Sequence, residues 1–320
     1  MASAETKAIL EVAGPQAAEA IVAVETRLRE VSSNHPAPLG PYVAEAVAAG
    51  GKRLRPLLAV LSAGAAAPDL SSVVRSGVAV ELIHAATLVH DDILDSADVR
   101  RGVPTVVAAG GREMAVAAGD LLFAVAFGEL IDNGVESVAV LAAAGSDLAR
   151  GELLQRADAW KTDISEDRYL TRCHLKTARL FEAAATLGAM AGGLDPRPFQ
   201  RFARSVGLAF QLLDDVLDVT GPPERTGKPR GADLLDGTVT LPWIVAAARD
   251  STLTEVDLHD LDSGSAVEIC DRIEATGALD DVRSQAAELA AEAQAIAVQM
   301  ASPTAEALSL VATTMVERSS

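Results

Sequence analysis

The chain has 320 residues, which allows one large domain or two ordinary ones. Hydrophobic residues make up 49% of it and aromatic residues only 3%, and Ala, Leu and Val carry the apolar content, which favours close-packed helices over sheets. The formal net charge of -18 argues against a nucleic-acid partner, because nucleic acids are bound by Lys and Arg side chains that neutralise phosphates.

The sequence predicts a cytoplasmic protein. Its two cysteines, Cys173 and Cys270, form neither a metal-ligand spacing nor a disulfide framework, which fits a reducing compartment. The first residues lack a basic stretch followed by an apolar run, so we expect no secretory signal. The longest apolar candidate, 114–131, is interrupted by Asp120 and Glu129, so we expect no transmembrane segment.

The predicted elements are helices throughout the chain. A proline cluster at 36–41 follows a first helical segment, and residues 105–195 and 243–302 contain no proline. These proline-free spans are rich in Ala, Leu and Glu, which suits helices joined by short turns. Apolar residues recur at helical spacing, for example in 80–88 and 202–213.

Nothing in the sequence divides the chain into separate domains. We find no convincing alternating strand, no repeat and no low-complexity linker. A Gly- and Pro-rich stretch at 221–231 predicts a loop between helices. The sequence therefore predicts one all-α domain, a helical bundle over residues 1–320.

The strongest signal is an Asp-Asp-x-x-Asp motif at the end of an apolar run. On a helix, Asp91 and Asp95 are four residues apart and Asp92 and Asp95 are three apart, so all three carboxylates share one face. The same spacing recurs at 214–218, again after an apolar run.

These motifs suit a metal-bound diphosphate. Carboxylates at the end of a buried helix are costly unless a positive charge meets them. Mg²⁺ prefers a few carboxylates, retained waters and substrate phosphates, and two such helix faces opposing each other would hold metal ions between them. A solvated helix face explains either motif equally well by itself, but less well when the motif occurs twice. The candidate metal ligands are Asp91, Asp92, Asp95, Asp214, Asp215 and Asp218.

Basic residues gather near the motifs in an otherwise acidic chain. Arg offers bidentate pairing to phosphate and Lys a point charge, so both are natural diphosphate ligands. Any one cluster alone could be ordinary surface charge. The candidates are Lys52 and Arg55 beside Gly51, Arg100 and Arg101 after the first motif, Lys176 with Thr177, and Lys228 after the second motif.

Together these residues resemble the trans-isoprenyl diphosphate synthases, also called polyprenyl synthetases. The match runs from Gly50 to about Pro242 and contains, in the family's order, GGKRLRP, ELIHAATLVHDDILD, RRG, HLKTARLFEAA, FQLLDDVLD and GKPRGADL. The resemblance implies an all-α fold of the isoprenoid synthase type with a central active-site cavity, and a homodimer. It also implies an enzyme that condenses isopentenyl diphosphate with an allylic diphosphate.

The resemblance also implies a role for each matching residue. The Mg²⁺ ligands on the allylic diphosphate would be Asp91, Asp92, Asp95 and Asp214, with Asp215 and Asp218 in support. The residues that hold isopentenyl diphosphate would be Lys52, Arg55, His84 and Arg101. The residues that contact the allylic diphosphate would be Arg100, Lys176, Thr177, Gln211 and Lys228.

Three features depart from the family's pattern. Thr238 stands where the family has a diphosphate-binding lysine after Asp-Gly. The segment 151–155 reads Gly-Glu-Leu-Leu-Gln, which is similar to medium- and long-chain members and lacks the Gly-Gln-x-x-Asp form of many short-chain members. Trp160 and Lys161 stand where acidic residues are more usual, and the sequence offers no explanation for them.

Product length should depend on the residues below the first motif. A helix rises about 1.5 Å per residue, so Ala86 and Thr87 should lie roughly 6 to 8 Å under the first aspartate. Both are small, whereas short-chain synthases often place an aromatic ring there, so the growing tail should pass. Ile83 is of moderate size, and Phe123 or Phe127 would close the tunnel deeper. We expect a product of geranylgeranyl length or longer.

Four other functions remain open. A short-chain, farnesyl-producing synthase is the nearest alternative. A class I terpene cyclase shares the fold and one aspartate motif but has no use for the GGKxxR segment. An HD-type phosphohydrolase would need a histidine cluster that is not evident, and a non-catalytic partner subunit would tend to lose the aspartate motifs that this chain keeps.

Overall fold

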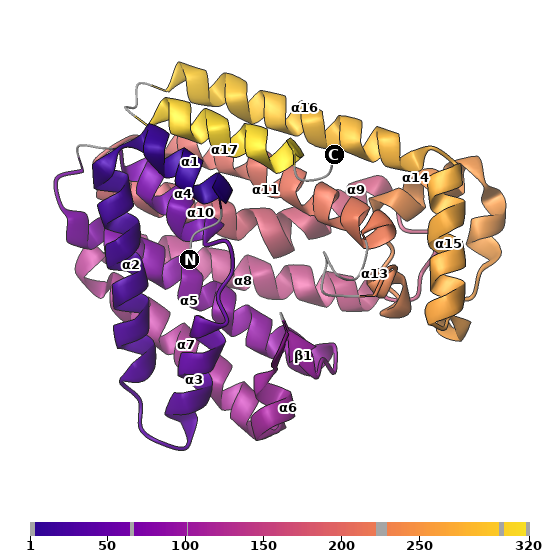
Figure 1. Cartoon of the computed structure of the whole chain (residues 1–320), viewed down its shortest axis with the longest axis horizontal. Coiled ribbons are helices and arrows are strands. Elements are labelled where there is room, and N and C mark those ends of the chain that lie inside the picture. Colours follow the sequence, from indigo (N-terminus) through magenta and orange to yellow (C-terminus); the bar gives the residue numbers. More distant parts are fainter. Residues whose placement is uncertain (1–3, 65–66, 101, 222–228, 301–303, 318–320) are drawn as a thin grey trace. The chain divides into compact units, whose positions relative to one another are not determined.

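The computed structural model of the chain is almost entirely helical, which confirms the all-α prediction (Figure 1). One antiparallel hairpin was not predicted, in which β1 (Val99–Arg100) pairs with β2 (Val103–Pro104). Two-residue strands are too short to show an alternating pattern. The structure describes all residues except 1–3, 65–66, 101, 222–228, 301–303 and 318–320.

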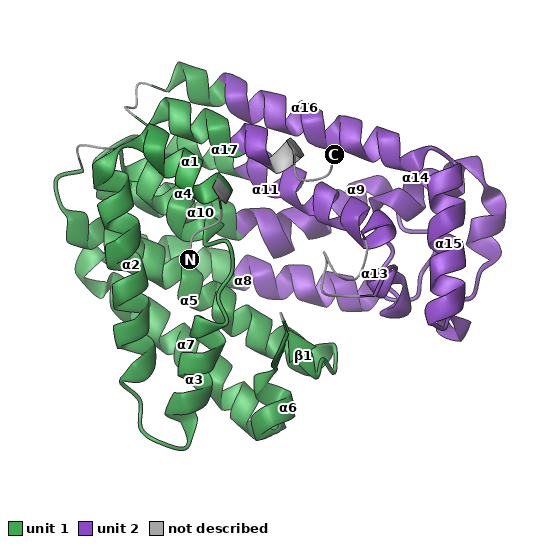
Figure 2. Cartoon of the chain, in the orientation of Figure 1, with its two compact units in different colours: residues 1–145, 180–203, 296–311 green, residues 146–179, 204–295, 312–320 purple. Residues whose placement is uncertain are grey.

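The chain forms two compact units, each made of three stretches of sequence (Figure 2). Unit 1 comprises Met1–Gly145, Leu180–Ala203 and Ile296–Val311. Unit 2 comprises Ser146–Arg179, Arg204–Ala295 and Ala312–Ser320. A single domain over the whole chain stays a prediction.

The elements divide between the two units as follows. Unit 1 contains β1, β2, α1 (Ala4–Ala13), α2 (Pro15–Ser33), α3 (Leu39–Ala48), α4 (Leu54–Ala63), α5 (Leu70–Leu94), α6 (Val106–Gly110), α7 (Arg112–Leu130) and the 3-10 turn η1 (Ile131–Asn133). Unit 2 contains α9 (Glu166–Cys173), the π-helix η2 (His174–Ala178), α13 (Ala232–Leu235), α14 (Leu241–Arg249), the 3-10 turns η3 (Ser251–Glu255) and η4 (Leu258–Asp260), and α15 (Ser263–Ala275). Both units receive residues from α8 (Val135–Asp158), α10 (Arg179–Ala191), α11 (Pro196–Thr220), α16 (Ala278–Gln299) and α17 (Ala305–Glu317).

Side-chain caps mark several helix starts. The carboxylate of Asp69 accepts from the N–H of Ser71 at 2.9 Å at the start of α5, and the Ser165 hydroxyl caps α9. Asp262 and Ser265 form a reciprocal capping box at α15. Such caps satisfy N–H groups that the first helical turn leaves unpaired, so they fix where each helix begins.

Helix α5 is the centre of unit 1. It packs against α7, α4 and α2 (Figure 1), and about half of its side chains are buried. Leu82, Ile83 and Ala86 are fully buried. The middle of α5 is therefore part of the core, and its last turn, which carries acidic residues, reaches the surface.

The core of unit 2 anchors α11. Leu212, Val216 and Trp243 are fully buried in one apolar cluster, and Tyr169 is 1% exposed in the same cluster. Because four buried α11 residues, Leu212, Leu213, Val216 and Val219, belong to this cluster, the polar residues on the other side of α11 are held at defined positions.

Two helices of the described chain are long and apolar enough to cross a membrane by length and composition alone. They are α5 and the stretch Arg112–Asn133, whose most apolar windows are 72% and 33% buried in the structure. The core helix of a soluble protein passes the same test, so this is weak support for a span. The expected absence of a transmembrane segment stays a prediction.

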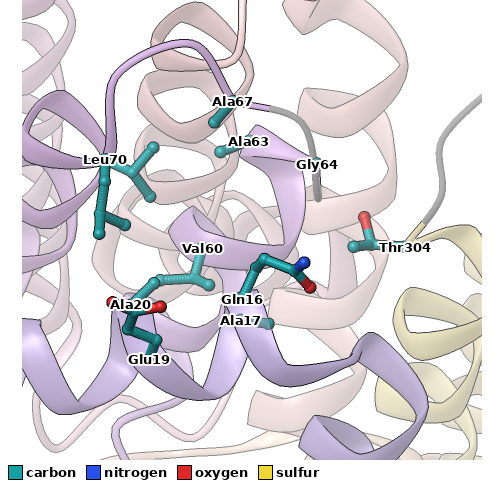
Figure 3. A pocket seen from close by; sticks show the side chains of 11 residues that line it. Gln16, Ala17, Glu19, Ala20, Val60, Ala63, Gly64, Ala67, Leu70 and Thr304 are labelled. Atoms are coloured by element: carbon teal, nitrogen blue, oxygen red, sulfur yellow. The ribbon is translucent and has the colours of Figure 1, made fainter.

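A cavity of about 140 Å³ lies in unit 1 between α2, α4 and the start of α5 (Figure 3). Its walls are small apolar side chains such as Ala17, Ala20 and Val60, and Gln16 and Thr304 contribute polar groups. None of the predicted site residues that the structure describes lines this cavity, so the candidate site lies elsewhere.

Candidate active site

The first aspartate motif lies where α5 changes from buried to exposed. Asp92 is 4% exposed, Asp91 is half-buried and Asp95 is exposed. The N–H of Asp95 donates to the carbonyl of Asp91 at 2.8 Å, so the helical turn continues through the motif. Asp91 and Asp95 therefore share the accessible face of this turn, whereas Asp92 is buried.

The hairpin returns Arg100 to the same end of α5. Its Nε donates to Oδ1 of Asp92 at 2.6 Å, which supplies the positive charge that a buried carboxylate needs. Both residues also line a cavity of about 50 Å³ among α3, α5 and α6. The sequence suggested that Asp92 binds metal and Arg100 binds diphosphate, and in this structure they bind each other.

Of the basic residues around the start of α4, Arg53 has a structural role. Arg53 forms ion pairs with Glu25 at 2.7 Å and Glu81 at 2.6 Å, and sequence reasoning gave it no role. Lys52 is exposed in the preceding loop. The half-buried guanidinium of Arg55 lies 4.7 Å from the centre of a phenylalanine ring in α10. Arg53 thus anchors the segment and fixes where the predicted ligands Lys52 and Arg55 emerge.

The other predicted isopentenyl diphosphate ligands are described in part. His84 is half-buried on α5, seven residues before Asp91, and therefore lies on a similar helix face. Gly51 is exposed in the loop before α4. Arg101 lies outside the described residues.

The predicted chain-length residues differ in exposure. Ile83 and Ala86 are fully buried in unit 1, and Phe123 is half-buried on α7. Thr87 is half-buried, and its hydroxyl donates to the carbonyl of His84 at 2.8 Å. Thr87 is therefore the small residue that lies four positions before Asp91 on the partly accessible face.

His90 links the first motif to α7, and sequence reasoning gave it no role. Its ring centre lies 6.0 Å from that of Phe123, and Nε2 lies 3.4 Å from the carbonyl of Val116. A Cβ at Gly119 would lie 2.1 Å from Nε2, so only a glycine leaves room for the imidazole. The sequence shows a histidine directly before the motif. It does not show that the imidazole contacts Phe123 and Val116, because these residues lie on another helix.

The second motif divides its aspartates in the same way. On α11, Asp214 is exposed and Asp218 is half-buried, and the two are four residues apart. Asp215 is 1% exposed. The first and last carboxylates again share the accessible face, and the middle one is in the core.

Asp215 is held by two donors. Its Oδ2 accepts from the Tyr169 hydroxyl at 2.5 Å and its Oδ1 from Nε2 of Gln211 at 2.8 Å. Burial, together with the nearby charge of Asp233, raises the pKa of Asp215 to about 8. Gln211 in turn accepts from the Thr177 hydroxyl at 2.7 Å, so Asp215 orients two predicted diphosphate ligands.

A π-helical turn, η2, carries half-buried Lys176 and buried Thr177. Such turns are rare and often occur at functional sites. The wide turn lies directly against α8, where a Cβ at Gly151 would lie 2.6 Å from the backbone nitrogen of Lys176. The glycine of the Gly-Glu-x-x-Gln segment therefore allows α8 to approach the turn.

Two further residues of this α8 segment, Glu152 and Gln155, hold the ammonium group of Lys176. Lys176 Nζ lies 2.5 Å from Oε2 of Glu152 and 3.2 Å from Oε1 of Gln155. Arg156 Nε donates to the other oxygen of Glu152 at 3.0 Å. Burial alone would raise the pKa of Glu152, but the charges and hydrogen bonds of Lys176 and Arg156 outweigh it and lower the pKa. Sequence reasoning missed Glu152 and Arg156, although their helical i, i+4 spacing was visible.

The structure explains two of the departures from the family pattern together. Trp160 packs on Gly237, where a Cβ would lie 2.4 Å from the indole, and the Trp160 N–H donates to the Gly237 carbonyl at 2.8 Å. The indole of Trp160 also stacks with the His259 ring, with ring centres 4.3 Å apart. Trp160 thus fixes the Asp-Gly-Thr turn that ends in Thr238.

The residues present fit a hydrated divalent cation. Among the described residues, no group of three or more His, Cys, Asp and Glu side chains forms a metal cage. Mg²⁺ does not need one, because it keeps several waters and binds one or two carboxylates plus phosphates. Asp91 with Asp95, and Asp214 with Asp218, each offer such a pair. Lys228 lies outside the described residues. The motifs belong to different units, so the expectation that they face each other stays a prediction.

The helices and these two sites define an all-α protein with paired aspartate-rich motifs. The family model for polyprenyl synthetase matches residues 38–266, a longer span than the motifs alone. The chain belongs to the polyprenyl synthetase family and is therefore an enzyme that transfers prenyl groups.

Relatives of known activity and solved structure agree with this membership. The chain is 39% identical over 274 residues to heptaprenyl diphosphate synthase component 2 of Geobacillus stearothermophilus, covering 82% of this chain and 85% of the relative. It is 36% identical over 315 residues to the short chain isoprenyl diphosphate synthase of Methanothermobacter thermautotrophicus, covering 92% and 95%. It also superposes, with a TM-score of 0.89 and 34% identity over 95% of this chain and 96% of the other, on polyprenyl synthase from Caulobacter crescentus CB15 complexed with calcium and isoprenyl diphosphate.

Proposed function

We propose that this chain condenses isopentenyl diphosphate with an allylic diphosphate in a Mg²⁺-dependent reaction and releases geranylgeranyl diphosphate or a longer product. One observation carries the proposal. In each unit, two aspartates four residues apart lie on the accessible face of a helix, and the middle aspartate of the motif is buried. The names of the relatives and the ligands of the Caulobacter structure support the choice of substrates and of a divalent cation.

In unit 1, the cations around the start of α4 would bind isopentenyl diphosphate. Lys52 is exposed and flexible enough to follow a phosphate, and Arg55 offers a planar fork for bidentate contact. His84 would add a hydrogen bond from α5. The accessible carboxylates Asp91 and Asp95 would hold the cation that accompanies the allylic diphosphate.

In unit 2, Lys176 would neutralise the leaving group. As the allylic C–O bond breaks, its electron pair stays on the diphosphate, and a preorganised ammonium group stabilises this charge. Thr177 and Gln211 would orient the diphosphate oxygens. Bound Mg²⁺ would supply Lewis-acid stabilisation of the same oxygens.

The carbon–carbon bond would then form without a protein nucleophile. The double bond of isopentenyl diphosphate attacks the allylic cation, and the new cation loses a proton to restore a double bond. The released pyrophosphate is the expected proton acceptor. Apolar walls would protect the cation from water.

The product-length part of the proposal rests on this chain's own residues, because the relatives make products of several lengths. Ala86 and Thr87, which lie within the last two turns before Asp91, carry no aromatic ring. The Gly-Glu-x-x-Gln segment, which is similar to longer-chain members, supports the same conclusion. We also expect a cytoplasmic homodimer.

The purified full-length chain tests the proposal directly. It would be incubated with Mg²⁺, labelled isopentenyl diphosphate and either dimethylallyl, geranyl or farnesyl diphosphate, and the dephosphorylated products separated by chromatography. We expect labelled prenyl alcohols of geranylgeranyl length or longer, lost on chelation of Mg²⁺ and restored by its return. No labelled product with any primer would contradict the activity, and farnesol as the longest product would contradict the length.

A further inference from the structure

Unit 2 contains a cation that the proposed reaction has not used. Arg156 is near the C-terminal end of α8, and its side chain is 30% exposed. Its Nε donates to Glu152 at 3.0 Å, and its Nη1 lies 3.7 Å from Oδ1 of Asp236. The guanidinium therefore lies between the carboxylate that holds Lys176 and the turn that follows α13.

Arg156 and Lys176 are close neighbours because they share one carboxylate. Lys176 binds Oε2 of Glu152 and Arg156 binds Oε1. The two cations are thus separated by one carboxylate and two hydrogen bonds, a span that the oxygens of one diphosphate can match. An anion that reaches Lys176 comes within range of Arg156 as well, and a multiply charged diphosphate competes well with carboxylates for a guanidinium.

The surroundings of Arg156 are connected to the second motif on both sides. On one side, Thr177 follows Lys176 in η2 and donates to Gln211 at 2.7 Å. On the other side, Arg156 contacts Asp236, which ends the short helix α13. The backbone N–H of Asp233 in the same helix lies 3.3 Å from Oδ2 of Asp218. Arg156 therefore belongs to the same polar surroundings as the predicted metal ligands of unit 2.

The turn after α13 lacks a cation of its own at the position where the resemblance expects one. Thr238 is 8% exposed, and its hydroxyl lies 3.4 Å from Oδ2 of Asp236. The Trp160 stack fixes this turn, and Asp236 faces the guanidinium across it. Thr238, which replaces the expected lysine, and the Arg156 guanidinium of α8 thus both lie beside the Asp236 carboxylate.

We propose that Arg156 binds the substrate diphosphate and supplies from α8 the positive charge that Thr238 does not supply from the turn. This inference rests on the proposed function for its choice of ligand. A guanidinium suits the role because its planar fork pairs with two phosphate oxygens at once. The competing interpretation is a structural one, in which Arg156 only holds Glu152.

Binding of inorganic pyrophosphate in the presence of Mg²⁺ tests the proposal without any prenyl substrate. Calorimetry on the full-length chain would compare Arg156→Gln with the matched control Arg150→Gln, an exposed arginine on the same helix whose ion pair to Asp147 is 3.4 Å long. We expect Arg156→Gln to weaken pyrophosphate binding about tenfold and Arg150→Gln to change it less than about twofold. An Arg156→Gln protein that binds within about twofold of the wild type overturns the proposal.

Two further variants separate a direct contact from a structural one. Adding Thr238→Lys to Arg156→Gln returns a cation on the other side of the site, and we expect it to restore most of the pyrophosphate affinity. A folded double variant that stays weak overturns the direct contact. Should thermal unfolding show that the double variant does not fold, Arg156→Lys decides: it keeps the charge and should bind better than Arg156→Gln, and equal losses in both overturn the proposal.

The outcomes also separate this inference from the proposed function. A wild-type chain that binds pyrophosphate through Arg156 but forms no prenyl product contradicts only the proposed function. A wild-type chain that forms product while Arg156→Gln has unchanged pyrophosphate affinity contradicts only the role of Arg156.

Discussion

The second aspartate of each motif is buried, whereas the first and the last reach the surface. Asp92 pairs with Arg100, and Asp215 accepts from Tyr169 and Gln211. A buried carboxylate needs such partners to offset its lost hydration. From this repeated pattern we expect that the middle aspartate orients its neighbours and that the outer aspartates contact the ligand.

Asparagine substitutions at adjacent positions should separate these roles. Asp91→Asn should lower kcat/KM by at least about a hundredfold, because it weakens a metal contact, with a change in unfolding free energy below about 0.5 kcal/mol. Asp92→Asn should lower the unfolding free energy by about 1 to 3 kcal/mol, because Arg100 then faces a neutral amide. Denaturant unfolding and steady-state kinetics would measure both. Near-normal turnover of Asp91→Asn would show that the metal assignment is wrong.

The sequence predicts shared faces better than it predicts partners. The spacing of the motif places Asp91 and Asp95 together on any helix, because the helical repeat alone decides this. The partner of Asp92 depends on a two-residue strand that carries Arg100, and no periodicity signals so short an element. The pairing of Asp92 with Arg100, eight residues later, is therefore a contact that sequence reasoning missed although it named both residues.

At the scale of elements, the approach of α8 to the π-turn is the feature that places Lys176, a predicted diphosphate ligand. Gly151 leaves room for the backbone of Lys176, and Glu152 then reaches the ammonium group. The Gly-Glu-x-x-Gln pattern was visible in the sequence, but the π-turn was not, because its wider hydrogen-bonding leaves no distinct apolar period.

Alanine substitutions at two glycines of α8 should have opposite effects. Gly151→Ala should cost about 1 to 3 kcal/mol of stability and lower turnover, because the new Cβ displaces the backbone at Lys176. Gly145→Ala is the matched control: its Cβ would approach no atom closer than 3.9 Å. It should be neutral or stabilise by up to about 1 kcal/mol, since alanine favours helix.

Thermal unfolding and initial rates on both proteins would check this pair. A Gly151→Ala protein as active and as stable as Gly145→Ala would mean that the close contact between α8 and η2 does not constrain the lysine.

Helix α5 should control product length through its partly accessible face. Thr87 lies one turn before Asp91 and is half-buried, so a Phe at this position can occupy the path of the growing tail. Ala86→Phe would act at a fully buried position, where overpacking costs about 1 to 3 kcal/mol, so its folding must be verified first.

We expect Thr87→Phe to shift the product distribution toward shorter chains while the first condensation continues at a comparable rate. Chromatography of dephosphorylated products would show the shift. Val22→Phe on α2, at a side chain that is 65% exposed, should leave the distribution unchanged. An unchanged distribution in folded Thr87→Phe and Ala86→Phe would remove α5 from the chain-length wall.

For the molecule as a whole, the fold class was predictable because every long segment of the sequence agrees with it. Scarce aromatics, proline-free spans and apolar residues at helical spacing all favour helices, and consistency across levels is what specifies a fold. The stack of Trp160 on Gly237 and His259 was not predictable, because these residues come from three separate segments. Long-range side-chain contacts have no local signature in one sequence.

The exposed apolar surface of unit 1 leads to a prediction about assembly. In the stretch Arg112–Asn133, only 33% of the most apolar window is buried, and Val116 and Ile131 are 41% and 69% exposed. Val135, at the start of α8, is 81% exposed. Apolar side chains exposed in this region are candidates for an interface, and we expect a second copy of the chain to cover them.

Charged substitutions in this surface should therefore separate the copies. Ile131→Asp and Val135→Asp should each raise the dimer dissociation constant at least about tenfold, because a carboxylate buried in an apolar interface loses its hydration. Size-exclusion chromatography with light scattering over a range of concentrations would measure this. Val22→Asp, at a similarly exposed valine on α2, should leave the dimer intact. A wild-type chain that remains monomeric at micromolar concentration, or a dimer that tolerates both substitutions, would mean that this surface serves another purpose.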